Sequence, residues 1–295
     1  MASVWVCLAE GGGVEKRVTV PGVGEGTPKE GAKCFVHYRV FLEETGEEVY
    51  ATEENDGPPV EVVASAGAPG CSSTAGLGIG LLSMRKRERA ELRVRPEYGY
   101  GEEGSFSFPH VPPSSTLVYS ADLLGWLEEG EESLTTDMLF EERLAAAQRR
   151  RDLGVDEFRC GNYREAWSFF NMGISFLNED MMFQLKQEDL GKVHSIRHPL
   201  LLNSFSSLVR LKRYGQGLKL AEQVTREDPE NAKAWCRVAK GHRLLGNTGR
   251  ALEAIRAAEG LAPGSEAVRE ELERIREAES AGKERDKKRW FGMFG

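Results

Sequence analysis

The C-terminal half of the chain repeats itself at an interval of 34 residues. Gly217 and Ala251 are separated by this interval, and so are Pro229 and Pro263. This length is typical of helical hairpins that bury their apolar faces only by stacking on one another. The repeat therefore predicts a row of stacked hairpins and disfavours an unrelated helical bundle.

Three hairpins fit the repeat over residues 137–264. The last one fits best, because large and small residues stand where neighbouring helices interlock, and the middle one is weakest, because Gly217 replaces the usual alanine. Ala166 of the first hairpin precedes Gly217 by 51 residues. About 17 residues beyond the period, near residues 178–195, are therefore inserted between the first two hairpins.

Apolar spacing and helix-ending residues place the individual helices. We expect helices over residues 136–160, 163–177, 200–213, 215–227, 232–245, 248–261 and 265–288. The third could begin well before residue 200, although Pro199 would kink it. Residues 265–295 should form a capping helix with a basic, aromatic tail. Its residues Trp290, Phe291, Met293 and Phe294 could cover the last hairpin or touch a partner.

The sequence changes character near residue 130. Residues 18–127 are rich in Gly, Pro, Val and Tyr, and in stretches such as residues 90–96 apolar and charged side chains alternate. This alternation predicts half-buried strands. We therefore expect a two-domain α+β protein, with residues 1–17 as a strand or frayed end and residues 128–136 as an acidic linker.

Composition argues against several classes of function. The net charge of −8 disfavours nucleic-acid binding, which needs a concentrated basic surface. The apolar runs are too short to cross a bilayer, and the first residues lack the features of a secretory signal. Five cysteines without a CxxC pair indicate neither a disulfide framework nor a zinc site. We expect a cytoplasmic protein with no membrane span, cofactor or nucleic-acid partner.

His194 and His198 are four residues apart and could share a metal on one side of a helix. No third ligand is evident near them in the sequence, and Pro199 makes a helix boundary an equal alternative. We therefore predict no metal site.

The N-terminal half resembles an FKBP domain. Three ordered motifs carry the resemblance, residues 31–49, 80–104 and 111–124, and it extends from Pro28 to Trp126. The resemblance implies a curved antiparallel sheet wrapped over one short helix. In active members of the family, an apolar aromatic pocket favours the twisted X-Pro amide and so catalyses cis-trans isomerisation.

The pocket of active FKBPs is only partly retained in this sequence. Four positions keep or conservatively replace its residues: Tyr38, Tyr100, Val111 and Tyr119. Five positions carry other residues: Val49, Tyr50, Val60, Thr74 and Leu77. By the resemblance, Tyr50 stands in place of the pocket aspartate and Leu77 in place of the tryptophan at its floor. The lost aromatic area predicts weak or absent isomerase activity.

The helical half is similar to the tetratricopeptide domains of FKBP-type co-chaperones. Those domains hold the EEVD terminus of the ninety-kilodalton heat-shock chaperone in a carboxylate clamp. The resemblance places four residues at clamp positions: Arg151, Asn203, Lys233 and Arg237. Cationic side chains and an amide can together hold the two carboxylates of a terminal aspartate. Val155 departs from the asparagine that is frequent at its position.

Three functions are compatible with these patterns. The first is an adaptor whose hairpins bind the chaperone tail while the FKBP-like domain presents a surface to a client or signalling protein. The second is an active prolyl isomerase tethered to the chaperone. The third is a repeat protein that binds another acidic peptide. The seventy-kilodalton chaperone has a similar tail, and the sequence does not separate the two.

Overall fold

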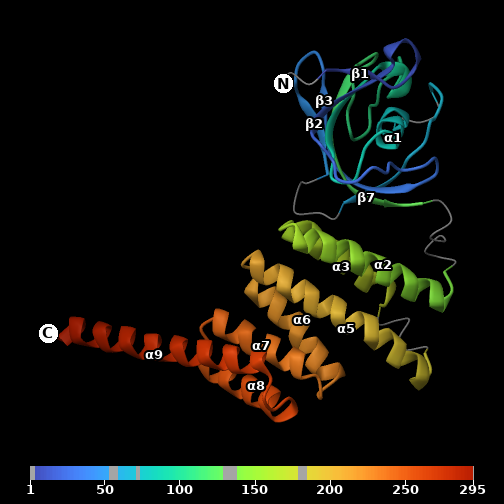
Figure 1. Ribbon diagram of the computed structural model, residues 1–295. Helices are drawn as coiled ribbons and strands as arrows, with labels where there is room; N and C mark the ends of the chain where they lie inside the picture. Colours follow the sequence, from blue (N-terminus) through green and yellow to red (C-terminus); the bar gives the residue numbers. More distant parts are fainter. Residues whose placement is uncertain (1–3, 53–58, 71–73, 129–137, 179–184, 295) are drawn as a thin grey trace. The chain divides into compact units, whose positions relative to one another are not determined.

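The computed structural model describes residues 4–52, 59–70, 74–128, 138–178 and 185–294 (Figure 1), with the side chains of residues 187 and 285–294 excepted. The chain divides into two compact units, Met1–Met138 and Leu139–Gly295. Most of the expected acidic linker lies outside the described residues, as do the aromatic side chains of the expected C-terminal tail.

The first unit is built on an antiparallel sheet. Its described strands are β1 (Val6–Cys7), β2 (Val14–Val20), β3 (Lys33–Leu42), β4 (Glu48–Ala51), β5 (Val60–Val63), β6 (Arg89–Val94) and β7 (Leu117–Leu127). They follow the order β1-β2-β6-β7-β3-β4, and β5 also pairs with β3. The predicted alternation is seen in β6, where every second side chain is buried. Because β2 pairs with β6, the sheet includes residues before position 18.

One short helix, α1 (Ala75–Leu82), packs against this sheet with Leu77 and Leu81 fully buried. Two glycines allow the close approach. A Cβ atom on Gly76 would lie 2.4 Å from a methyl carbon of Val94, and one on Gly80 would lie 2.2 Å from a methyl carbon of Leu92. Helix and sheet form the curved antiparallel fold that the FKBP resemblance implies.

The regular elements in the described part of the second unit are all helices (Figure 1). Its helices are α2 (Phe140–Arg159), α3 (Tyr163–Phe176), α5 (Gln187–Arg210), α6 (Tyr214–Glu227), α7 (Ala232–Leu244), α8 (Thr248–Leu261) and α9 (Glu266–Phe294). Helices α2 and α3, α5 and α6, and α7 and α8 pack as three successive pairs, and α9 packs on α7 and α8. The predicted arrangement of three hairpins and a capping helix is confirmed.

Helix α5 begins well before residue 200, which is the earlier start that the inserted segment left open. It starts at Gln187 and runs through Pro199, so part of the inserted segment forms additional turns of this helix. Glu188 and Asp189 in its first turn are favourable there because carboxylates complement the positive end of a helix. Pro199 has no N–H group and so cannot donate a backbone hydrogen bond within the helix. Burial of Val193 and Leu200 on either side of it offsets this loss.

None of the helices in the described ranges combines the length with the apolar composition that a membrane crossing requires.

Candidate functional site

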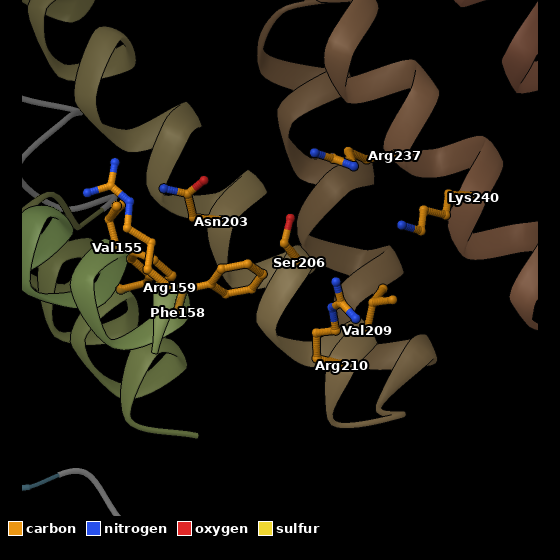
Figure 2. A pocket seen from close by; sticks show the side chains of 10 residues that line it. Val155, Phe158, Arg159, Asn203, Ser206, Val209, Arg210, Arg237 and Lys240 are labelled. Atoms are coloured by element: carbon orange, nitrogen blue, oxygen red, sulfur yellow. The ribbon is translucent and has the colours of Figure 1, made fainter. Parts of the chain in front are cut away.

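A groove in the helical unit collects most of the predicted clamp residues. One of its cavities has a volume of 390 Å³ and is lined by the first helix of each hairpin, together with Phe170 of α3. Its polar lining consists of Arg159, Asn203, Ser206, Arg210, Arg237 and Lys240 (Figure 2). Its apolar lining consists of Val155, Phe158, Phe170 and Val209.

A second cavity of 490 Å³ adjoins the first and shares Val155, Arg159 and Asn203 with it. Arg151 lines this second cavity, whereas Arg237 lines the first. The structure therefore places Arg151, Asn203 and Arg237 along one groove. Lys233 is exposed and is not part of the lining of either cavity.

Helical spacing explains why these side chains share the groove. On α2, Arg151 and Arg159 are two turns apart with Val155 between them, and on α7, Lys240 follows Arg237 by three residues. Residues at these spacings lie on the same side of a helix.

Three of the lining cations, Arg159, Arg210 and Lys240, were missed by the sequence analysis. Each stands three, seven or eight residues from a predicted clamp residue on the same helix. Residues three or four positions apart, or two turns apart, share one side of a helix. A search at these spacings from Arg151, Asn203 and Arg237 would have identified all three cations.

The wall formed by α7 is strongly electropositive. Figure 2 shows Arg237 and Lys240 extending from α7 toward the helix that carries Asn203. Burial, followed by the positive charge of Arg237, lowers the pKa of Lys240. Within the described part of the chain, no carboxylate forms an ion pair with either residue. The carboxylate of Glu271 acts in the opposite direction on this pKa, without an ion pair to Lys240. Neighbouring positive charges that repel one another favour binding of an external anion.

On the wall formed by α2, nearby carboxylates partly neutralise the positive charge. Arg151 lies 3.8 Å from the carboxylate of Asp152, and Arg159 lies 3.8 Å from that of Asp156. Ion pairs at these distances, with largely exposed carboxylates, contribute little to stability. The two arginines can therefore leave their aspartates and bind a ligand instead. The groove is therefore basic at both walls, with an apolar strip that includes Phe158 and Phe170.

In the first unit, Tyr38 contacts two other tyrosines that the sequence places at positions of the FKBP pocket. The ring of Tyr38 lies 5.3 Å from that of Tyr50 and 5.9 Å from that of Tyr119, measured between centroids. Burial raises the pKa of Tyr38, and Tyr50 and Tyr100 raise it further. The pKa of Tyr119 is raised as well, mainly by burial and to a lesser extent by Tyr100 and Tyr38. The phenols of Tyr38 and Tyr119 therefore stay neutral at physiological pH.

The other predicted pocket residues are distributed between the core and the surface. Leu77 and Val111 are buried in the core of the unit, and Val49 packs against this core while remaining half-buried. Val60 is half-buried in β5, and Thr74 is exposed just before α1. The structure thus groups Leu77, Val111 and Val49 with the tyrosines, whereas Thr74 faces solvent.

The ring of Tyr50 also lies 5.8 Å from the ring of Phe108, which is 80% exposed. Tyr50 therefore connects the partly buried Tyr38 to an exposed aromatic side chain. A phenol in these contacts offers neither the charge nor the small size of the carboxylate that the FKBP resemblance implies at this position.

Comparison with known proteins identifies a family for the first unit. The family profile described as FKBP-type peptidyl-prolyl cis-trans isomerase matches residues 24–124. A crystal structure of a multi-domain immunophilin from Arabidopsis thaliana is 33% identical, with a TM-score of 0.42, and the match covers 88% of this chain and 98% of that one.

Two curated proteins match over most of their length. The human protein named inactive peptidyl-prolyl cis-trans isomerase FKBP6 is 26% identical over 227 residues, which cover 74% of this chain and 68% of that protein. Peptidyl-prolyl cis-trans isomerase FKBP42 of Arabidopsis thaliana is 33% identical over 281 residues, which cover 95% of this chain and 76% of that protein. The extent of this last similarity shows that the chain belongs to the FKBP-type immunophilins, with an FKBP domain followed by a helical region.

Proposed function

We propose that this immunophilin is a co-chaperone adaptor. Its helical unit, a tetratricopeptide domain in this proposal, binds the EEVD terminus of the ninety-kilodalton heat-shock chaperone. The observation that carries the proposal is the groove in which Asn203, Arg237 and Lys240 share a cavity with an apolar strip, with no carboxylate among the described residues in an ion pair with either cation. A peptide that ends in aspartate has two carboxylates within a few ångströms, which is the ligand that such a surface complements.

Each part of the groove has a role in this proposal. Arg237 donates hydrogen bonds to the terminal carboxylates, and the amide of Asn203 donates one more from α5. Arg151 extends the positive wall toward the acidic residues that precede the terminus. The valine of the EEVD sequence packs on the apolar strip that contains Phe158 and Phe170.

In the same proposal, the FKBP domain acts as a protein-interaction module with weak or absent isomerase activity. The packing of Tyr50 against Tyr38 supports this reading, because the ring takes the place where the resemblance implies a carboxylate. Burial of Leu77 at the position of the floor tryptophan supports it as well. The partner of this domain would be a client or signalling protein.

The test is calorimetric titration of the full-length protein with a peptide that ends in EEVD. Arg237→Ala should weaken binding by at least about tenfold, since a hydrogen bond to a charged group contributes about 1.5–3 kcal/mol. Asn203→Ala should weaken it by a smaller factor. Arg256→Ala is the matched control, because Arg256 is exposed on α8 and lines neither cavity of the groove.

The ligand can be varied as well as the protein. Amidation of the peptide removes the terminal carboxylate and should abolish most of the binding. Equal affinity of wild type and Arg237→Ala would refute the clamp. An acidic peptide with a scrambled terminus that binds as tightly as EEVD would instead favour a general acidic-peptide receptor.

A further inference from the structure

Two histidines and a glutamate converge at the end of helix α6. His194 and His198 lie on α5 with their rings stacked at 4.6 Å between centroids, and Glu227 is the last residue of α6. One ligand atom from each of the three residues lies within 4.8 Å of the others. They line a cavity of 450 Å³ together with Asp228 and Asn231. The cluster is separate from the lining of the peptide groove, apart from the shared Pro199.

Two of the ligand atoms already have the spacing of a zinc site. The Nε2 atom of His198 lies 3.1 Å from an Oε atom of Glu227. Zinc bonds of about 2.0–2.1 Å at a tetrahedral angle place two ligand atoms about 3.3 Å apart. A metal ion can therefore replace the hydrogen bond between His198 and Glu227 with a small movement, and rotation of the half-buried His194 brings in the third ligand.

The charges around the cluster favour a divalent cation. Glu227 and Asp228 contribute two negative charges, and Arg197 contributes one positive charge through hydrogen bonds of 2.5 and 2.6 Å to the two oxygens of Glu227. The balance is one negative charge. The cluster also lies at the C-terminal end of a 14-residue helix, where the helix dipole attracts cations.

The surroundings resemble the outer shell of a metal site. Arg197 is 3% exposed and holds the Glu227 carboxylate in place, as outer hydrogen bonds orient ligands in metalloproteins. His198 is buried, whereas His194 is half-buried and the Asp228 side chain is 39% exposed. One side of the cluster is thus fixed and the other is open to an entering ion and a water ligand.

We propose that His194, His198 and Glu227 form a zinc-binding site between the second helical hairpin's two helices. Two imidazoles and one carboxylate form a ligand set that zinc accepts, with water in the fourth position. The proposal reverses our prediction of no metal site. That prediction lacked a third ligand, and the third ligand comes from a residue 29 positions after His198 in the next helix.

The test is a zinc titration of the full-length chain under reducing conditions, with any affinity tag removed, in competition with a chromophoric chelator. We expect one ion per chain. His194→Ala should weaken zinc binding by at least about tenfold, because even loss of an outer-shell partner costs 10–100-fold in affinity. His110→Ala is the matched control: it removes an exposed histidine of the other unit and leaves every thiol unchanged.

Two further readouts separate a built site from adventitious binding. Zinc should raise the melting temperature of wild type and of His110→Ala clearly more than that of His194→Ala. Cobalt should give the visible absorption of a tetrahedral complex only where His194 is present. Equal zinc affinity in wild type and His194→Ala, or no change of melting temperature in wild type, would overturn the site. Neither readout depends on peptide binding, so this proposal and the adaptor proposal can fail separately.

Discussion

Replacing Glu271 by glutamine should loosen α9 from α7. The side chain of Glu271 is 3% exposed, and its two oxygens accept hydrogen bonds from Arg243 of α7 at 2.6 and 3.4 Å. Arg274 approaches the same carboxylate at 3.6 Å. Removing the carboxylate leaves the guanidinium of Arg243, 18% exposed, without its counterion in the contact between the two helices.

The expected loss in the free energy of unfolding follows from the burial of this ion pair. Removing one partner of a buried ion pair costs about 3–5 kcal/mol, and the remaining exposure of Arg243 favours the lower end, about 3 kcal/mol. Glu270→Gln is a matched control on the adjacent residue. Glu270 pairs with Arg274 at 3.1 Å, but both side chains are about half exposed. An exposed pair at this helical spacing contributes about 0.3–0.5 kcal/mol.

Urea unfolding monitored by circular dichroism at the helical signal gives the free energy of unfolding for both variants. Wild type and Glu270→Gln should nearly coincide, and Glu271→Gln should unfold at a clearly lower urea concentration. A loss of about 3 kcal/mol is a large part of the 5–15 kcal/mol typical of a domain. If both variants lost the same free energy, or Glu271→Gln lost less than about 1 kcal/mol, the reasoning from burial would be refuted.

Two other predictions concern the FKBP domain. We expect the wild-type chain to isomerise a proline peptide at least about tenfold more slowly than an active FKBP, because Tyr50 and Leu77 alter the pocket. A rate equal to that of an active member would contradict this. Burial, and to a lesser extent Glu128, raises the pKa of Cys34 to about 12, so about one thiol in ten thousand is ionised at pH 8. Iodoacetamide at pH 8 should therefore modify the exposed Cys160 and spare Cys34 in the folded protein, as mass spectrometry of peptides would show. Equal labelling of the two would contradict the burial of Cys34.

The architecture was predictable because its signals are local. A period of 34 residues and alternation of period two each reflect the geometry of a single element or hairpin. The boundaries of α6, α7 and α8 agree with the expected ranges to within one residue at each end. The start of α5 was left open between residue 200 and an earlier residue, because the effect of Pro199 on a helix competes with packing of Val193 and Leu200, which the sequence does not show.

The site residues also fall into two groups, those set by spacing within one element and those that depend on contacts between elements. Arg151, Asn203 and Arg237 could be selected because each occupies a position set by the repeat, and Lys240 could have been added by helical spacing alone. The contacts of Tyr50 with Tyr38, and of Glu227 with His198, join different elements. No periodicity within one strand or helix specifies such contacts, because they depend on the way in which two elements are paired.

This difference has a consequence for a histidine pair spaced four residues apart on a helix. In the sequence, His194 and His198 had no third ligand, and the nearest carboxylates along the chain belong to the first turn of α5. The hairpin turn reverses the chain so that the end of α6 returns beside the first half of α5, which brings Glu227 to His198. In a helical hairpin, the residues to search for a missing ligand are therefore those about one hairpin length away.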